Sequence, residues 1–228
     1  MKPLVPAFLK SSRLYRLVEI VASTRGYLRT SGWWASLWRG VPVASDGAPI
    51  PWVTLPSISF LEPRLRPDFQ VLEFGCGHST HWFAARVRNV VSIEHDREWA
   101  ATSRAEAPEN VTIHLAATGQ TSSYVDIAHG TPNDHNSYVQ KIDDLKQRFD
   151  VILVDGVYRH ACIRRCPDLL TDVGVIIVDN TDYPEIATSL QWLEGHGFRK
   201  LDFHGLHSGL SVPGLTSIFY RNQNCLKL

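Results

Sequence analysis

The segment that most constrains this chain runs from Val71 to Thr80 and reads VLEFGCGHST. A short apolar run leads to Glu73, and two glycines follow one residue apart, Gly75 and Gly77. An amphipathic run comes next, so the pattern predicts a buried strand that turns tightly into a helix. Glycine allows a ligand to approach the backbone of such a turn, and the helix start presents unpaired N–H groups. The segment therefore predicts a loop that binds a nucleotide-type ligand.

A second strand pattern follows this loop and ends in an acid. Residues 90–94 read VVSIE, and Glu94 lies about 20 residues after the first glycine, where a carboxylate can accept the ribose hydroxyls. A dinucleotide fingerprint would have its third glycine at the position of Thr80. Because that glycine is missing, the loop fits a nicotinamide cofactor poorly.

Acid-Gly-x-Gly followed by a strand-end glutamate resembles the class I S-adenosylmethionine-dependent methyltransferases. The resemblance covers residues 69–222 and implies S-adenosylmethionine as the cofactor. It assigns the methionine part to Glu73 and the glycine loop, the ribose to Glu94, and the adenine edge to the two residues that follow. The full set expected at the cofactor is Glu73, Gly75, Cys76, Gly77, Ser79, Thr80, Glu94, His95, Asp96 and Asp155. The alternative is an α/β turn that binds no cofactor.

Strand and helix patterns alternate from Gln70 onward, which predicts an α/β fold. We expect a doubly wound, mostly parallel, seven-stranded Rossmann-like sheet with helices on both faces. The expected strands lie at about 70–74, 90–94, 111–115, 150–155, 173–179, 199–204 and 216–221. The expected helices between them lie at about 80–87, 97–106, 136–148, 159–170 and 184–196. The family resemblance implies that the seventh strand is antiparallel and lies beside the fifth.

The first 52 residues differ from the rest, and we expect them to form a helical and aromatic cap over a domain at 53–228 that binds S-adenosylmethionine. Apolar residues at helical spacing predict a helix from about Ser11 to about Leu28, and a short helix is expected over Leu55–Leu65. Residues 1–40 contain seven basic residues and one acidic residue, a net charge of +6. The cap is expected to place one of Trp33, Trp34, Trp38 and Trp52 in the acceptor pocket. The alternative is that this basic segment lies on an anionic membrane surface.

Polar side chains follow the expected fourth and fifth strands. Asp155 ends the fourth strand, and Asp179 and Asn180 end the fifth. Oxygen ligands at neighbouring strand ends are suited to Mg²⁺, so the three residues are predicted to form a metal site. The pattern resembles the metal-dependent catechol and caffeoyl-thioester O-methyltransferases, but Tyr158 stands where that family has a lysine. The alternative is that Asp155 orients the cofactor or substrate and the later acids cap a helix.

Composition narrows the class of protein. Hydrophobic residues make up 44% of the 228 residues and charged residues 20%, which is typical of a globular chain. The formal net charge is zero, which argues against a nucleic-acid partner. Four cysteines without disulfide or zinc spacing predict free thiols in a reducing cytoplasm. No apolar run reaches the roughly 18 residues of a transmembrane helix, so we expect a cytoplasmic protein, with a homodimer as one oligomeric state.

These patterns together predict methyl transfer to an oxygen, hydroxyl or carboxyl, of a small molecule. The predicted catalytic residues are Asp155 together with His160 or Tyr158 as the base. A glycine-rich connection at 205–215 is expected to be either a flap near the site or a solvent-facing loop. The same fold could instead transfer an aminopropyl group. It could also serve as a cofactor-fold interaction protein without catalysis.

Overall fold

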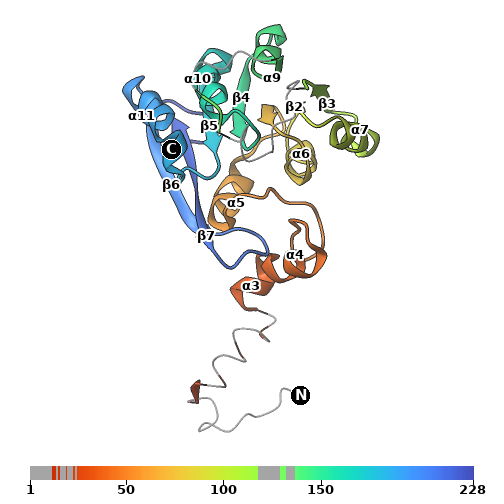
Figure 1. Ribbon diagram of the computed structural model, residues 1–228. Coiled ribbons are helices and arrows are strands. Elements are labelled where there is room, and N and C mark those ends of the chain that lie inside the picture. Colours follow the sequence, from red (N-terminus) through yellow and green to blue (C-terminus); the bar gives the residue numbers. More distant parts are fainter. Residues whose placement is uncertain are drawn as a thin grey trace.

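The protein forms one seven-stranded sheet, which the computed structural model shows in the order β3-β2-β1-β4-β5-β7-β6 (Figure 1). The structure describes residues 25–117, 129–131 and 137–228, with residues 12, 13, 15, 19 and 23. The strands are β1 Gln70–Phe74, β2 Asn89–Glu94, β3 Val111–Leu115, β4 Phe149–Val154, β5 Leu170–Val178, β6 Arg199–Leu206 and β7 Pro213–Tyr220. Strands β1 to β5 pair in parallel, and β7 is antiparallel to both β5 and β6. The predicted fold class and the antiparallel seventh strand are confirmed.

Helices cover both faces of the sheet. The α-helices are α3 Tyr27–Thr30, α4 Trp33–Arg39, α5 Leu55–Leu61, α6 His78–Ala84, α7 Arg97–Glu106, α9 Ser137–Gln140, α10 Arg159–Leu169 and α11 Ala187–Gly195. The described ranges also contain the short 3-10 helices η1 Glu62–Arg64, η2 Lys141–Asp144 and η3 Pro184–Ile186. One core cluster joins the sheet to α9, α10 and α11, and the other joins it to α5 and α6. Alternate strand residues enter the two clusters, Leu72 the first and Val71 the second, as expected when both faces of a parallel sheet are buried.

The helix expected over 80–87 is observed at His78–Ala84, and the helix expected over 184–196 is the 3-10 turn η3 followed by α11. Three further expected helices differ more. Most of the helix predicted from Ser11 lies outside the described residues, but it does not continue to Leu28, because the chain turns at Gly26 before α3 begins. The helix expected over 136–148 is reduced to α9 and η2. The helix expected over Leu55–Leu65 ends at Leu61, after which Pro63 accompanies a 3-10 turn.

The segment before β1 packs against the connection between β6 and β7. Thr54 forms an antiparallel bridge with His207, and the backbone N–H of Thr54 donates to Thr216 Oγ1 on β7 (3.0 Å). Figure 1 shows α4 beside the same connection. Within the ranges described above, no helix has the length and apolar character needed to cross a membrane.

Candidate active site

Two turns meet backbone to backbone at the carboxyl ends of β1 and β4. Gly75 has a φ of 93°, a left-handed conformation that favours glycine, and its N–H donates to the carbonyl of Ile93 (2.8 Å). An added Cβ on Gly75 would lie 3.5 Å from the Cα of Gly156, which directly follows Asp155. A Cβ on Gly156 would lie 2.9 Å from the carbonyl of Phe74. Glycine at both positions thus lets the two turns pack closely; sequence analysis recognised Gly75 and missed Gly156.

The carboxylate of Glu73 is buried beneath the glycine loop. It accepts hydrogen bonds from Ser92 Oγ (2.6 Å), from Ser79 Oγ (2.7 Å) and from the hydroxyl of Thr80. The same Thr80 oxygen accepts the N–H of Gly77 (2.9 Å). Burial raises the pKa of Glu73 to about 7, although the three hydroxyl donors lower it. Glu73, on β1, is therefore hydrogen-bonded to β2 through Ser92 and to the start of α6 through Ser79 and Thr80, which fixes both ends of the glycine loop.

Replacement of Glu73 by glutamine should change how stability depends on pH. The pKa of Glu73 rises from 4.5 to about 7 on folding, so its contribution to stability is present at low pH and is lost as pH rises through 7. Each pKa unit corresponds to roughly 1.36 kcal/mol, so the free energy of unfolding of the parent should fall by about 3 kcal/mol as Glu73 ionises. Glu73→Gln should abolish this fall, because glutamine does not ionise.

Urea unfolding between pH 4.5 and pH 7 measures this effect, with Glu98→Gln on the exposed face of α7 as the matched control. Asp155 titrates in the same window, so the relevant quantity is the difference between variant and parent at each pH. A difference that stays constant across the window would contradict the burial of a titrating Glu73.

Glu94, at the end of β2, is hydrogen-bonded to the glycine loop. Its carboxylate accepts the backbone N–H groups of His95 (2.7 Å), Asp96 (2.8 Å) and Cys76 (3.1 Å). Burial raises the pKa of Glu94, but the hydrogen bonds from His95, Asp96 and Cys76 outweigh it and hold the pKa below its usual value. The indole N–H of the exposed Trp99 donates to the carbonyl of Cys76 (2.7 Å). The structure thus brings the predicted cofactor residues of β1 and β2 together.

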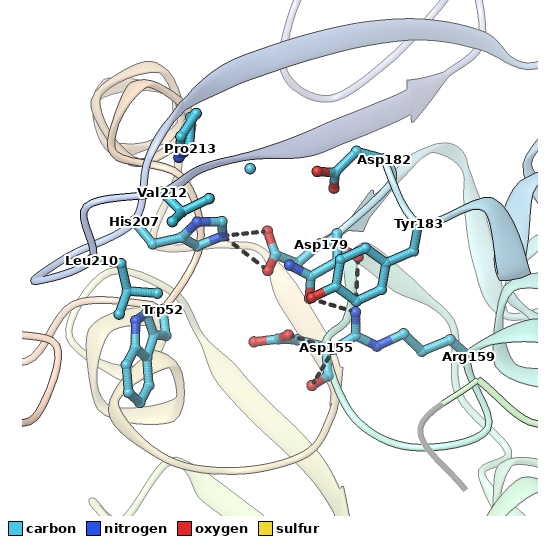
Figure 2. A pocket seen from close by; sticks show the side chains of 12 residues that line it. Trp52, Asp155, Arg159, Asp179, Asp182, Tyr183, His207, Leu210, Val212 and Pro213 are labelled. Carbon is cyan, nitrogen blue, oxygen red and sulfur yellow. Dashed lines mark hydrogen bonds and ion pairs between the residues drawn. The ribbon is translucent and has the colours of Figure 1, made fainter. Parts of the chain in front are cut away.

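A cavity of about 710 Å³ opens beside these turns, at the carboxyl ends of β4 and β5 (Figure 2). Its charged and polar lining includes Asp155, Arg159, Asp179, Asn180, Asp182 and His207. Its apolar lining includes Trp52, Leu210 and Val212. The other tryptophans expected at the acceptor pocket, at positions 33, 34 and 38, are not among the lining residues. Ligands of open α/β sheets bind at this edge, so the cavity is the candidate acceptor site.

The three predicted metal ligands come together, but around an arginine. The guanidinium of Arg159 lies 3.2 Å from Asp155 Oδ1 and donates to Asn180 Oδ1 (2.7 Å) and to the backbone carbonyl of Asp179 (3.1 Å). Arg159 is buried on the first turn of α10, and its positive charge offsets the negative charge of Asp155. The described ranges contain no group of three or more His, Cys, Asp and Glu side chains arranged to hold a metal ion. Arg159 takes up oxygens of Asp155 and Asn180 that Mg²⁺ would need, so the arrangement does not support the predicted metal site.

His207 and Asp179 form a buried pair in the cavity wall. Nε2 of His207 lies 3.2 Å from Asp179 Oδ2, and Thr216 Oγ1 donates to Asp179 Oδ1 (2.5 Å). Burial lowers the pKa of His207, but the hydrogen bond to Asp179 and the charges of Asp179 and Asp155 raise it above its usual value overall. Figure 2 shows the His207 ring pointing towards Asp179, with Asp155 below the pair. Sequence analysis missed His207, although it noted the connection that carries it.

Asp155 shares the cavity with this pair. Burial and repulsion from Asp179 raise the pKa of Asp155 to about 7, although Arg159 and His207 lower it. Two neighbouring carboxylates thus lie beside one permanent cation, Arg159, and beside His207, which carries a charge only when it is protonated.

The predicted bases His160 and Tyr158 lie elsewhere. His160 is buried between α10 and α11, where Nδ1 pairs with Ser189 Oγ (2.8 Å) and Nε2 contacts the carbonyl of Glu185. Tyr158 caps the start of α10 with a φ of 52°, and its buried ring lies 6.3 Å from that of Tyr138. Neither residue lines the cavity, so the geometry does not support either as the base.

Comparisons with known proteins identify the fold. No family model matches the sequence, and no curated protein matches it either. A candidate O-methyltransferase from Klebsiella pneumoniae is similar over 89% of this chain and 94% of its own, with a TM-score of 0.54 and 16% identity. A candidate methyltransferase from Streptococcus mutans, solved with S-adenosylhomocysteine, is similar over 71% and 94%, with a TM-score of 0.51 and 12% identity.

Spermidine synthase from Thermotoga maritima has the same TM-score of 0.51 at 15% identity, and the match covers 72% of this chain but 56% of the synthase. At these identities the likeness concerns the fold alone. The chain has the Rossmann-like fold of class I methyltransferases, as the resemblance predicted.

Proposed function

We propose that this protein is an S-adenosylmethionine-dependent methyltransferase that methylates an oxygen atom of a small-molecule acceptor. The observation that carries the proposal is a cavity at the carboxyl ends of the strands, with the His207–Asp179 pair in its wall, next to a glycine turn at the end of β1. The cavity with its histidine suits a hydroxyl acceptor, and the glycine turn suits the cofactor.

The residues around the glycine turn fit S-adenosylmethionine. Gly75 and Gly156 let the turn after β1 and the turn after β4 pack against each other, and Gly75 takes the left-handed φ that the glycine turn needs. Glu94 stands at the end of β2, where a carboxylate can accept ribose hydroxyls, and Trp99 offers an exposed ring beside the loop. When bound, the cofactor supplies an electrophilic methyl carbon on a sulfonium sulfur.

His207 is the base in this proposal. A neutral His207 can accept the proton of an acceptor hydroxyl, while Asp179 orients the ring and stabilises the imidazolium that forms. The Thr216 hydroxyl holds the Asp179 carboxylate in place (2.5 Å). The apolar side chains of Trp52, Leu210 and Val212 line one side of the acceptor cavity. A carboxyl acceptor, already ionised, would not need His207.

Calorimetry with S-adenosylmethionine tests the cofactor assignment. The parent should bind, and Glu94→Gln should weaken binding by about 1–3 kcal/mol because a neutral amide accepts the ribose hydroxyls less well. Glu98→Gln, an equal change on the neighbouring helix α7, is the matched control and should bind as the parent does. A parent that does not bind the cofactor would overturn the proposal, and equal binding by Glu94→Gln would remove the ribose assignment.

Chelation should leave turnover unchanged. Arg159 contacts the oxygens of Asp155 and Asn180 that Mg²⁺ would need. The positive charge beside these residues is therefore that of the Arg159 guanidinium and does not require a metal ion. Turnover of the parent before and after EDTA treatment measures this, and a loss that added Mg²⁺ restores would contradict it.

An aminopropyltransferase is the second candidate. Three carboxylates, those of Asp155, Asp179 and Asp182, line the cavity and could receive a cationic amine. The fold shared with spermidine synthase is compatible with this activity. Calorimetry with decarboxylated S-adenosylmethionine separates the two, because an aminopropyltransferase should prefer the decarboxylated form. Binding of neither compound would favour a cofactor-fold interaction protein without catalysis.

A further inference from the structure

Exposed apolar side chains surround the mouth of the cavity. Trp52, Leu210 and Val212 line the cavity and are also exposed to solvent, Val212 over 71% of its surface. Figure 2 shows these three side chains on the side of the cavity opposite Arg159. Large apolar side chains gathered in this way mark a surface that an apolar partner covers.

This apolar surface continues onto helix α4. The indole N–H of Trp33 donates to the carbonyl of Leu210 (2.7 Å), which attaches α4 to the connection at the mouth. An added Cβ on Gly209 would lie 3.0 Å from the backbone N of Leu37, so the two backbones are in close contact. Leu37 and Trp38 are exposed, Trp38 over 76% of its surface. We name the five exposed residues Leu37, Trp38, Trp52, Leu210 and Val212 the apolar rim.

Positive charge is concentrated beside the apolar rim. Arg25 and Arg29 are exposed at and within α3, and Arg39 is exposed directly after Trp38. Among the residues that the structure describes, none of the three arginines forms an ion pair with a carboxylate. Residues 1–40 carry a net charge of +6 in a chain whose total is zero. The three described arginines therefore lie in or next to α3 and α4, the two helices beside the β6–β7 connection that carries Leu210 and Val212 (Figure 1).

We propose that the apolar rim and the neighbouring arginines dock the protein on an anionic lipid surface, with the cavity mouth facing the bilayer. Tryptophan and other apolar side chains enter the headgroup region, and the arginines stay with the anionic headgroups. A consequence, which rests on the function proposed above, is that the acceptor is an amphiphile. Its polar head reaches His207 in the cavity while its apolar part remains in the lipid.

Sedimentation with lipid vesicles tests the docking. The full-length protein should sediment with vesicles of equal parts phosphatidylglycerol and phosphatidylcholine and much less with phosphatidylcholine alone. Added salt should release it, because salt screens the attraction of the arginines for the headgroups. A protein that remains in the supernatant with anionic vesicles would overturn the proposal.

Substitutions test whether vesicle binding depends on the apolar rim and the neighbouring arginines. Trp38→Ala and Val212→Ser should each weaken vesicle binding by about tenfold, and Arg25→Gln and Arg29→Gln by about fivefold each. The matched control is Val173→Ser, the same change at a partly exposed valine near the start of β5, and it should bind like the parent. If Trp38→Ala and Val212→Ser bind like the parent as well, the apolar rim is not the docking surface.

Sedimentation velocity separates lipid docking from self-association. A dimer that Trp38→Ala dissociates would mean that a second copy of this chain covers the apolar rim, and it would overturn the proposal. Vesicle binding is measured without S-adenosylmethionine, so its failure is distinct from a failure of the proposed function. His207→Gln provides the converse check, because a protein impaired in catalysis should still sediment with anionic vesicles.

Discussion

Replacing His207 by glutamine should lower kcat/KM for a hydroxyl acceptor by roughly 10²- to 10⁴-fold, the usual contribution of a general base. Glutamine keeps a polar group of similar reach beside Asp179 but cannot take up a proton. Calorimetry should show unchanged affinity for S-adenosylmethionine, because His207 lies in the acceptor cavity and not at the glycine turn. Steady-state kinetics with any acceptor that turns over measures the effect.

His204→Gln is the matched control, since His204 is exposed on β6 three residues before His207. It should retain the activity of the parent. Parental turnover by His207→Gln with a hydroxyl acceptor would contradict the assignment of the base. The same result with a carboxyl acceptor is expected, because an ionised acceptor has no proton to give up.

The pH profile gives a second measure of the same pair. Activity should rise with pH as His207 loses its proton, and the midpoint should lie above the usual histidine pKa of about 6.5 because Asp179 and Asp155 raise the pKa of His207. Asp179→Asn removes the main cause of the rise, so the midpoint should move to lower pH. A purely structural role of His207 would leave no such shift.

Gly156→Ala should destabilise the protein by about 1–3 kcal/mol and abolish cofactor binding. The new methyl group would lie 2.9 Å from the carbonyl carbon and oxygen of Phe74 and would also contact the hydroxyl of Tyr138. The contact with Phe74 is to backbone, so the end of β1 would have to shift away from Gly156, which would separate the two turns. Urea unfolding measures the first effect and calorimetry with S-adenosylmethionine the second.

Gly195→Ala at the end of α11 is the control, because an added Cβ there meets no atom within 4 Å. It should leave stability and cofactor binding close to those of the parent. If Gly156→Ala binds the cofactor as tightly as the parent, the close packing of the two turns is not what shapes the cofactor site.

The sequence by itself determined the features that depend on neighbouring residues. The strand at 70–74, the strand at 111–115 and the helix at 97–106 are observed with the predicted bounds. The turn at Gly75 needs a left-handed φ, and that requirement can be read from the glycine itself. The start of α7 is equally local, because Asp96 accepts the N–H of Trp99 (2.8 Å).

Only the tertiary structure decided which side chains enter the cavity. Arg159 and His160 are adjacent in sequence, but successive residues of a helix point about 100° apart, so Arg159 faces the cavity while His160 faces α11. The sequence pattern could not show which face of α10 lies against the strand ends. It therefore could not show that the guanidinium of Arg159 contacts Asp155 and Asn180, two of the predicted metal ligands.

The pairing of His207 with Asp179 was also decided by the tertiary structure. The two residues are 28 positions apart, and they meet because β7 inserts antiparallel between β5 and β6 and brings the β6–β7 connection back over the end of β5. The backbone of Thr54 forms an antiparallel bridge with His207, which adds a third distant segment to this arrangement. Local patterns carry no information about such long-range contacts, because they depend on the strand order and register of the complete sheet.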